Sequence, residues 1–128
     1  MKHIFFLIIT IFCISNGMAQ DITNDSEKIY YAVETKPDFK GGIKEFYTYV
    51  SKNFRVPNVN KLSGKVIVSF VVEKDVSLTD IKVIRDIGYG TGEEAIRVLK
   101  NSPTWIPGYQ SGKPVRVMYT LPIVISTN

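Results

Sequence analysis

The fold is decided by the stretch Lys65-Val-Ile-Val-Ser-Phe-Val-Val-Glu-Lys74. Apolar residues occupy every second position from Val66 to Val72, so one face of this segment is fully apolar, as is typical of a strand. Residues 74–77 interrupt the pattern, and it resumes over residues 78–86, where Ile81 and Val83 alternate with polar residues. Two strands this close in sequence predict an antiparallel hairpin.

Helical periodicity flanks this hairpin on both sides. Before it, apolar residues recur from Ile43 at the i+3, i+4, i+7 and i+11 positions, which predicts a helix over about residues 42–53. After it, Thr91 stands three residues before Glu94, the spacing by which a helix start caps its own N–H groups. A second helix is therefore expected from Thr91, ended by Pro103 soon after Lys100.

A third strand is predicted over residues 115–125, where apolar and polar residues alternate again. Pro122 lies inside it, has no N–H to donate and is tolerated mainly where a strand has a free side, so this strand is expected to be an edge of the sheet. The expected fold is α+β, a three-stranded antiparallel sheet with two helices on one face, in the order helix, strand, strand, helix, strand. Trp105 is interpreted as the plug of the small core, with a carbohydrate-stacking platform shared with Tyr109 as the alternative.

Length and composition place the chain among ordinary globular proteins. Its 128 residues suffice for one domain, and 45% of them are apolar against 22% charged. The formal net charge of +4 is too small to indicate a nucleic-acid or membrane partner, and no nucleic acid is expected.

The first twenty residues are predicted to be an export signal. Lys2 and His3 form a basic start, residues 4–14 are apolar, and Gly17 to Ala19 offer the small residues that a signal peptidase reads. The apolar run is shorter than the ~20 residues of a spanning helix, so a cleaved signal is favoured over an uncleaved anchor. The protein is attached to a membrane only if the signal remains uncleaved. We expect a signal peptide over 1–20, a short polar lead-in over 21–30 and a folded domain over 31–128.

The expected mature chain contains neither cysteine nor histidine, because Cys13 and His3 lie in the signal. This excludes a thiolate nucleophile, a Cys or His zinc site and an imidazole base. Glu93 and Glu94 are interpreted as acids that complement the dipole of the second helix. We therefore expect no enzyme: no catalytic residue, no cofactor and no metal.

The free side of the last strand is the strongest candidate for function. An exposed row of N–H and C=O groups is a template to which another extended chain can add, which predicts a binding module for a peptide. The alternative is an envelope structural or interaction protein that pairs with a second copy through the same edge, as a homodimer, or binds an anionic cell-wall polymer. The basic residues Lys61, Lys65, Lys113 and Arg116 are expected to cluster near the predicted strand starts, where they either bind such a polymer or keep the sheet edges soluble.

Seven segments, in this order, resemble the TonB C-terminal domain family in the form common in Bacteroidetes. The match covers about residues 33–125. The segments are Phe39-Lys-Gly-Gly-Ile43, Asn53-Phe-Arg-Val-Pro57, Gly64-Lys-Val-Ile-Val-Ser-Phe-Val-Val72, Glu73-Lys-Asp75, Glu94-Ala-Ile-Arg-Val98, Trp105-Ile-Pro-Gly108, and Gly112-Lys-Pro-Val115 through Leu121-Pro122.

The resemblance implies a periplasmic protein that pairs an edge strand with the TonB box of an outer-membrane receptor, in TonB-dependent energy transduction and transport across the outer membrane. Another envelope protein is the alternative partner. Arg55, Val56 and Pro57 stand where the family usually has a Tyr-Pro pair, and Val76 replaces the glycine usual after Asp75. By position, the implied partner-binding residues of the last strand are Val115, Arg116, Val117, Met118, Tyr119, Thr120 and Leu121.

Overall fold

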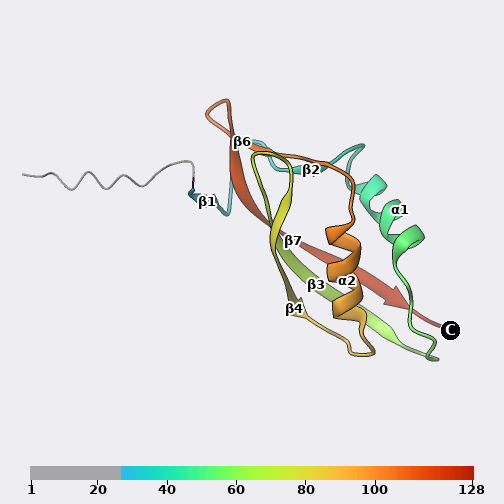
Figure 1. The fold of residues 1–128 in the computed structure, drawn as a ribbon. Coiled ribbons are helices and arrows are strands. Elements are labelled where there is room, and N and C mark those ends of the chain that lie inside the picture. Colours follow the sequence, from blue (N-terminus) through green and yellow to red (C-terminus); the bar gives the residue numbers. More distant parts are fainter. Residues whose placement is uncertain (1–26) are drawn as a thin grey trace, which may run out of the picture.

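The computed structural model describes residues 27–128 (Figure 1). The expected signal peptide and residues 21–26 of the expected lead-in lie outside the described residues. The elements are β1 (Ile29–Tyr30), β2 (Asp38–Phe39), α1 (Ile43–Asn53), β3 (Ser63–Val72), β4 (Leu78–Arg85), α2 (Thr91–Lys100), β5 (Trp105–Ile106), β6 (Gly108–Gln110) and β7 (Lys113–Ser126).

The sheet is built around β3, which pairs antiparallel with β4 on one side and with β7 on the other. The β3–β7 register runs without interruption from Ser63 opposite Ser126 to Val72 opposite Val117. The predicted hairpin and the predicted last strand are therefore confirmed, as are both helices.

One face of β3 forms the floor of the core. Its apolar residues are fully buried, and the same cluster includes Phe46 of α1 and Val98 of α2, so both helices cover this one face (Figure 1). Trp105 is 1% exposed, and its ring centroid lies 5.1–6.0 Å from four other aromatic rings. Its interpretation as a core plug is confirmed. The four rings belong to Phe39, Phe46, Phe70 and Tyr119.

The expected count of three strands is wrong. The main sheet has five strands, because β1 pairs parallel with β7 and β6 pairs antiparallel with β7, while β2 and β5 form a second, two-stranded sheet. The last two residues of the expected lead-in, Ile29 and Tyr30, form β1. Strands of two or three residues carry no measurable alternation, so periodicity does not reveal them.

The start of α2 differs from the expected capping box. The helix does begin at Thr91, but its preceding residue is Gly90 in the left-handed region, and no side chain caps the first N–H groups. The hydroxyl of Thr91 donates instead to Asp86 and to the carbonyl of Gly88. The carboxylate of Glu94 turns away toward the segment that follows α1.

The turn between β3 and β4 holds Val76 in a strained conformation. The Val76 N–H donates to the carbonyl of Glu73 at 2.9 Å, and its φ is 69°, in the left-handed region that a β-branched residue rarely adopts. This position follows Asp75 and is the one where the family resemblance implies a glycine. The substitution therefore stores strain in a tight turn.

Replacing Val76 with glycine is expected to stabilise the domain by about 1 kcal/mol, because the left-handed region costs an L-residue roughly 1–2 kcal/mol. Thermal unfolding of V76G measures this, as a rise in Tm. The matched control is Lys74→Gly in the same turn, where φ is not positive and glycine only adds flexibility to the unfolded chain. A lower Tm for V76G would contradict the strain at this position.

Candidate functional site

Strand β7 has one unpaired side over its last nine residues. Strand β3 covers the other side from Val117 to Ser126, whereas β1 reaches only Arg116 and Val117, and β6 reaches only residues 113–115. Within residues 27–128, no strand pairs with the second side of residues 118–126. We call this side the free edge of β7.

The expected binding segment therefore needs a correction at its start. Val115 is paired with Gly108, while Arg116 and Val117 are paired with β1, so these three residues offer no open edge. The expected edge is found only from Met118 onward. The sequence did not reveal this because the covering strands, β1 and β6, are too short to detect by alternation.

Pro122 lies where the free edge tolerates it. Its carbonyl accepts a hydrogen bond from the hydroxyl of Tyr47 at 3.0 Å, and this contact with α1 places the carbonyl on the side away from β3. Pro122 thus costs the β3–β7 ladder no hydrogen bond. Because backbone direction alternates along a strand, Thr120 and Val124 present their N–H and C=O groups on the same free side.

The free edge of β7 carries no charge. Residues 117–128 include no Lys, Arg, Asp or Glu. Strand β4, at the opposite end of the sheet, is protected by charged side chains and by Asp80, whose φ of 51° disturbs the strand. Charges and irregular backbone are the usual protection of sheet edges. Of the two edges, β7 is therefore the one open to another strand.

An apolar groove runs beside this edge. It has a volume of about 520 Å³ and lies between α1, the segment after it, and the end of β7. Val56 is 54% exposed, so apolar surface faces solvent here. Val124 borders the groove from β7, but its side chain, 67% exposed, lies on the sheet face away from the helices, because its neighbours Ile123 and Ile125 are buried in the core. None of the lining residues is charged. They are Tyr47, Val50, Ser51, Phe54, Val56, Ile123, Val124, Ile125 and Ser126.

An ion pair on α2 holds the wall of the groove. Glu94 and Arg97 pair three residues apart; the Arg97 guanidinium donates to the carbonyl of Asn53 at 2.7 Å, and the Glu94 carboxylate accepts the N–H of Arg55. These contacts fix the chain on both sides of Phe54. Val56, predicted from the resemblance, lines the groove, while Pro57 is half-buried and its carbonyl accepts the N–H of Val59.

Most side chains of the predicted partner-binding residues of β7 make contacts inside the domain. The Arg116 guanidinium forms a two-pronged contact with Glu73 at 2.8–3.0 Å and also donates to the carbonyl of Glu27, so it is used inside the domain. Tyr119 is half-buried and packs on Trp105. Met118 and Thr120 lie on the sheet face away from the helices, opposite Val71 and Ser69. The core holds Val115, Val117 and Leu121.

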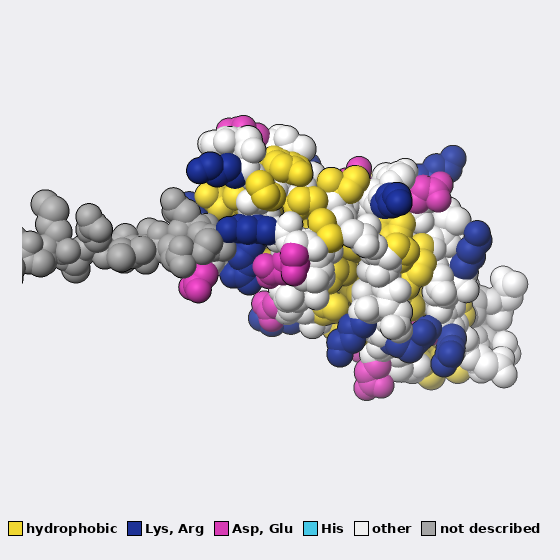
Figure 2. All heavy atoms as spheres, turned by 45° about the horizontal axis from the view of Figure 1, so that its top comes forward, with side chains coloured by type: hydrophobic (Ala, Val, Ile, Leu, Met, Phe, Trp, Pro, Cys, Tyr) yellow, Lys and Arg dark blue, Asp and Glu magenta, His cyan; other side chains and the backbone are white. Residues whose placement is uncertain are grey.

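The basic residues considered for an anionic polymer do not form one cluster. Lys65 lies opposite Val124, whereas Arg116 lies just beyond the pair of Val72 and Val117, at the other end of β3. Seven residues of strand separate these ends, roughly 24 Å. The starts of antiparallel strands lie at opposite ends of a sheet, which explains the error. Figure 2 shows Lys and Arg side chains spread over the face in view, with apolar and acidic side chains between them.

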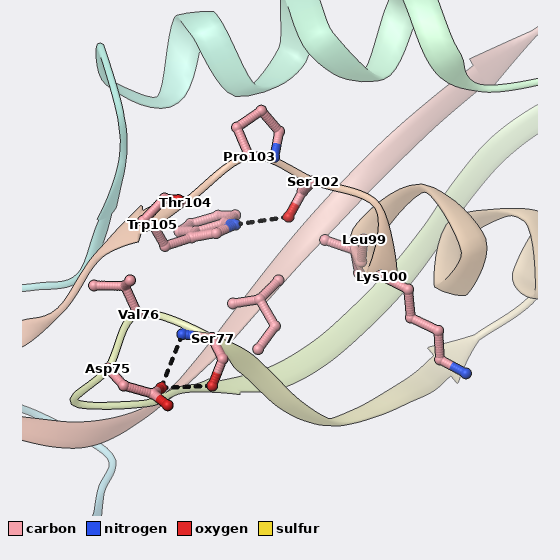
Figure 3. Close-up of a pocket in the computed structure, with 10 residues that line it drawn as sticks. Asp75, Val76, Ser77, Leu99, Lys100, Ser102, Pro103, Thr104 and Trp105 are labelled. Carbon is pink, nitrogen blue, oxygen red and sulfur yellow. Dashed lines mark hydrogen bonds between the residues drawn. The ribbon is translucent and has the colours of Figure 1, made fainter.

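A second cavity, of about 400 Å³, lies between the β3–β4 turn and the chain that follows α2 (Figure 3). The indole N–H of Trp105 donates to Ser102 at 3.2 Å, and the Asp75 carboxylate accepts both the N–H and the hydroxyl of Ser77. The side chain of Lys100 points away from these groups (Figure 3). The acid and the base of this cavity thus do not converge as a catalytic pair would.

Residues 27–128 contain no group of three His, Cys, Asp or Glu side chains placed to hold a metal ion. In the same range, neither helix is long and apolar enough to cross a membrane.

The geometry defines a class of protein: an α+β interaction domain with an open, uncharged strand edge beside an apolar groove. The model of the family described as Gram-negative bacterial TonB protein C-terminal matches residues 58–124, and the chain belongs to this family. It is also similar to the C-terminal domain of TonB from Helicobacter pylori, residues 179–285, solved by NMR in solution. The identity is 26% and the TM-score 0.50, over 67% of this chain and 80% of that one. A search of curated proteins found no match.

TonB C-terminal domains are periplasmic interaction domains of Gram-negative bacteria, without enzymatic activity. Several groove residues were missed as site residues by the sequence analysis, chiefly Tyr47, Phe54 and Val124. Two signals were available: the absence of charge after Arg116, and the apolar helical face from Ile43, which was assigned wholly to the core.

Glu94 is expected to make stability depend on pH. Its hydrogen bond with Arg97 lowers its pKa below the ordinary 4.5. The pair therefore contributes its stability above pH 4.5 and loses it as the pH falls through the lower pKa of the folded state. We expect E94Q to cost up to about 1 kcal/mol at pH 7, because the Arg97 side chain is partly exposed and solvent screens the pair.

Thermal unfolding between pH 3 and pH 7 measures this effect. The Tm difference between the wild type and E94Q should be constant above about pH 5 and shrink below it. Glu93→Gln, an exposed neighbour on the same helical turn, is the control and should leave the Tm nearly unchanged. An equal Tm loss at pH 3 and pH 7 would show that the charge of Glu94 is not what holds the groove wall.

Proposed function

We propose that this protein captures an extended segment of a TonB-dependent outer-membrane receptor, its TonB box, by adding that segment as a strand to the free edge of β7. The protein thereby serves TonB-dependent energy transduction and transport across the outer membrane, from an exported position in the periplasm. The observation that carries the proposal is the uncharged, unpaired edge over residues 118–126.

Strand addition uses both features of this surface, the open N–H and C=O groups of β7 and the apolar groove beside them. The N–H and C=O groups of Thr120 and Val124 supply hydrogen bonds that do not depend on the partner's sequence. An added strand lies ~4.8 Å from β7, and its side chains alternate between the two sheet faces. Every second side chain then points toward α1, into the groove lined by Phe54 and Val56. Selectivity for apolar residues at alternate positions follows.

The family supports a receptor as the partner. The match over residues 58–124 includes β3, β4, α2 and most of β7, so it covers the strand with the free edge. The similarity to the Helicobacter pylori TonB domain extends this support to the fold.

A second copy of the chain is the other candidate for the same edge. An uncharged edge suits a second copy of β7 as well as it suits a receptor segment. Binding of a receptor peptide and self-pairing would compete for residues 118–126. Sedimentation of the free domain over a range of concentrations separates them, because only self-pairing raises the mass.

Titration with synthetic TonB-box peptides from receptors of the same organism tests the proposal. We expect Val124→Lys to weaken binding about fivefold or more, because it places a charge on the free edge, on the sheet face that carries Met118 and Thr120. Ile84→Lys is the matched control, since Ile84 is a similarly exposed aliphatic residue on the other edge strand, 62% against 67% exposed. It should leave the affinity unchanged.

The absence of binding by every peptide at millimolar concentration would contradict the proposal. An equal loss of affinity in V124K and I84K would also contradict the proposal. It would mean either that the peptide adds to β4 or that any added positive charge weakens binding.

A further inference from the structure

Tyr47 stands across the free edge of β7. Its side chain reaches from α1 to the strand, where the hydroxyl donates to the carbonyl of Pro122 at 3.0 Å. The residue is 37% exposed and forms one end of the apolar groove. A partner strand that ran the full length of the edge would have to pass the position that this side chain occupies.

The contact divides the edge into two short parts. Residues 118, 120, 122, 124 and 126 face the free side. The central one offers nothing to a partner, because Pro122 has no N–H and its carbonyl already accepts the hydrogen bond from Tyr47. On the N-terminal side of Met118, β1 pairs with Arg116 and Val117 and so closes the edge there. With Tyr47 in place, a partner can pair beside Thr120 or beside Val124, but not continuously along both.

We propose that Tyr47 is a latch on the free edge, which a partner segment must displace from Pro122 in order to pair along residues 118–126. The inference rests on the proposed function and adds to it a control on binding. The latch keeps an uncharged edge partly occupied until a partner arrives, a protection that charged residues supply on β4.

The surroundings of Tyr47 fit a contact that can open. The ring packs on Phe46 at a centroid distance of 5.3 Å, and only two side-chain torsions have to change to move the hydroxyl into water. Burial raises the pKa of Tyr47 above its ordinary 10, so the hydroxyl remains a proton donor at neutral pH. The hydrogen bond is thus present under periplasmic conditions and has to be broken by a competitor.

Tyr49, on the same helix, makes a similar contact away from the free edge. It is half-buried, its hydroxyl donates to the carbonyl of Val98 at 2.8 Å, and its ring lies 6.0 Å from that of Phe39. This contact joins α1 to α2 and lies off the edge of the sheet. Tyr49 therefore provides a matched control, with the same loss of one hydroxyl and one bond to a backbone carbonyl.

The experiment compares Tyr47→Phe and Tyr49→Phe with the wild type, by titration with the synthetic TonB-box peptides. Y47F leaves the Pro122 carbonyl free, so it should bind about three- to tenfold more tightly, the contribution of one neutral hydrogen bond. Y49F should bind as the wild type does. Thermal unfolding of each variant checks that the fold is retained.

The outcomes separate the latch from the proposed function. If the wild type binds and Y47F binds equally or more weakly, Tyr47 is no latch, while the proposed strand addition stands. If Y49F gains as much affinity as Y47F, the gain comes from a looser α1, and the latch is again overturned. If neither the wild type nor Y47F binds any peptide, both proposals fail.

Discussion

The burial of one face of β3 is the constraint on which the rest of the structure depends. Val66, Val68, Phe70 and Val72 are fully buried beneath two helices and Trp105. A chain of this length has a small core, and this face of β3 supplies four of its fully buried residues. This apolar face continues from β3 onto β7, which pairs with β3 along the whole length of β3. Within the described residues, the other side of β7 is covered only at its start, by β1 and β6, and is open over residues 118–126.

The same core places the parts of the binding site. Phe46 and Val50 pack downward into the core, and helical spacing then directs Tyr47 sideways to the end of the sheet, next to Pro122. The ion pair on α2 holds the segment after α1 at the distance that leaves a groove. The packing of α1 against β7 therefore determines both the groove and the contact of Tyr47 with the free edge.

Much of the fold could be predicted from the sequence, because alternation and helical spacing are strong over eight or more residues. Pro122 correctly indicated a free side on the last strand. The short strands β1, β2, β5 and β6 could not be predicted, since two or three residues carry no period. Because these strands were not predicted, the expected binding segment included Val115, Arg116 and Val117, which β6 and β1 cover. The contact between Arg116 and Glu73 is also long-range, and no local pattern reveals it.

Backbone amide hydrogen exchange along β7 tests most directly the claim that the free edge of this strand receives the partner. The measurement follows Thr120 and Val124 in the domain alone and with a saturating TonB-box peptide. The account predicts rapid exchange of both amides in the free protein and strong protection in the complex, with β4 unchanged. Protection gained on β4, or none on Thr120 and Val124 in a complex that does form, would contradict it.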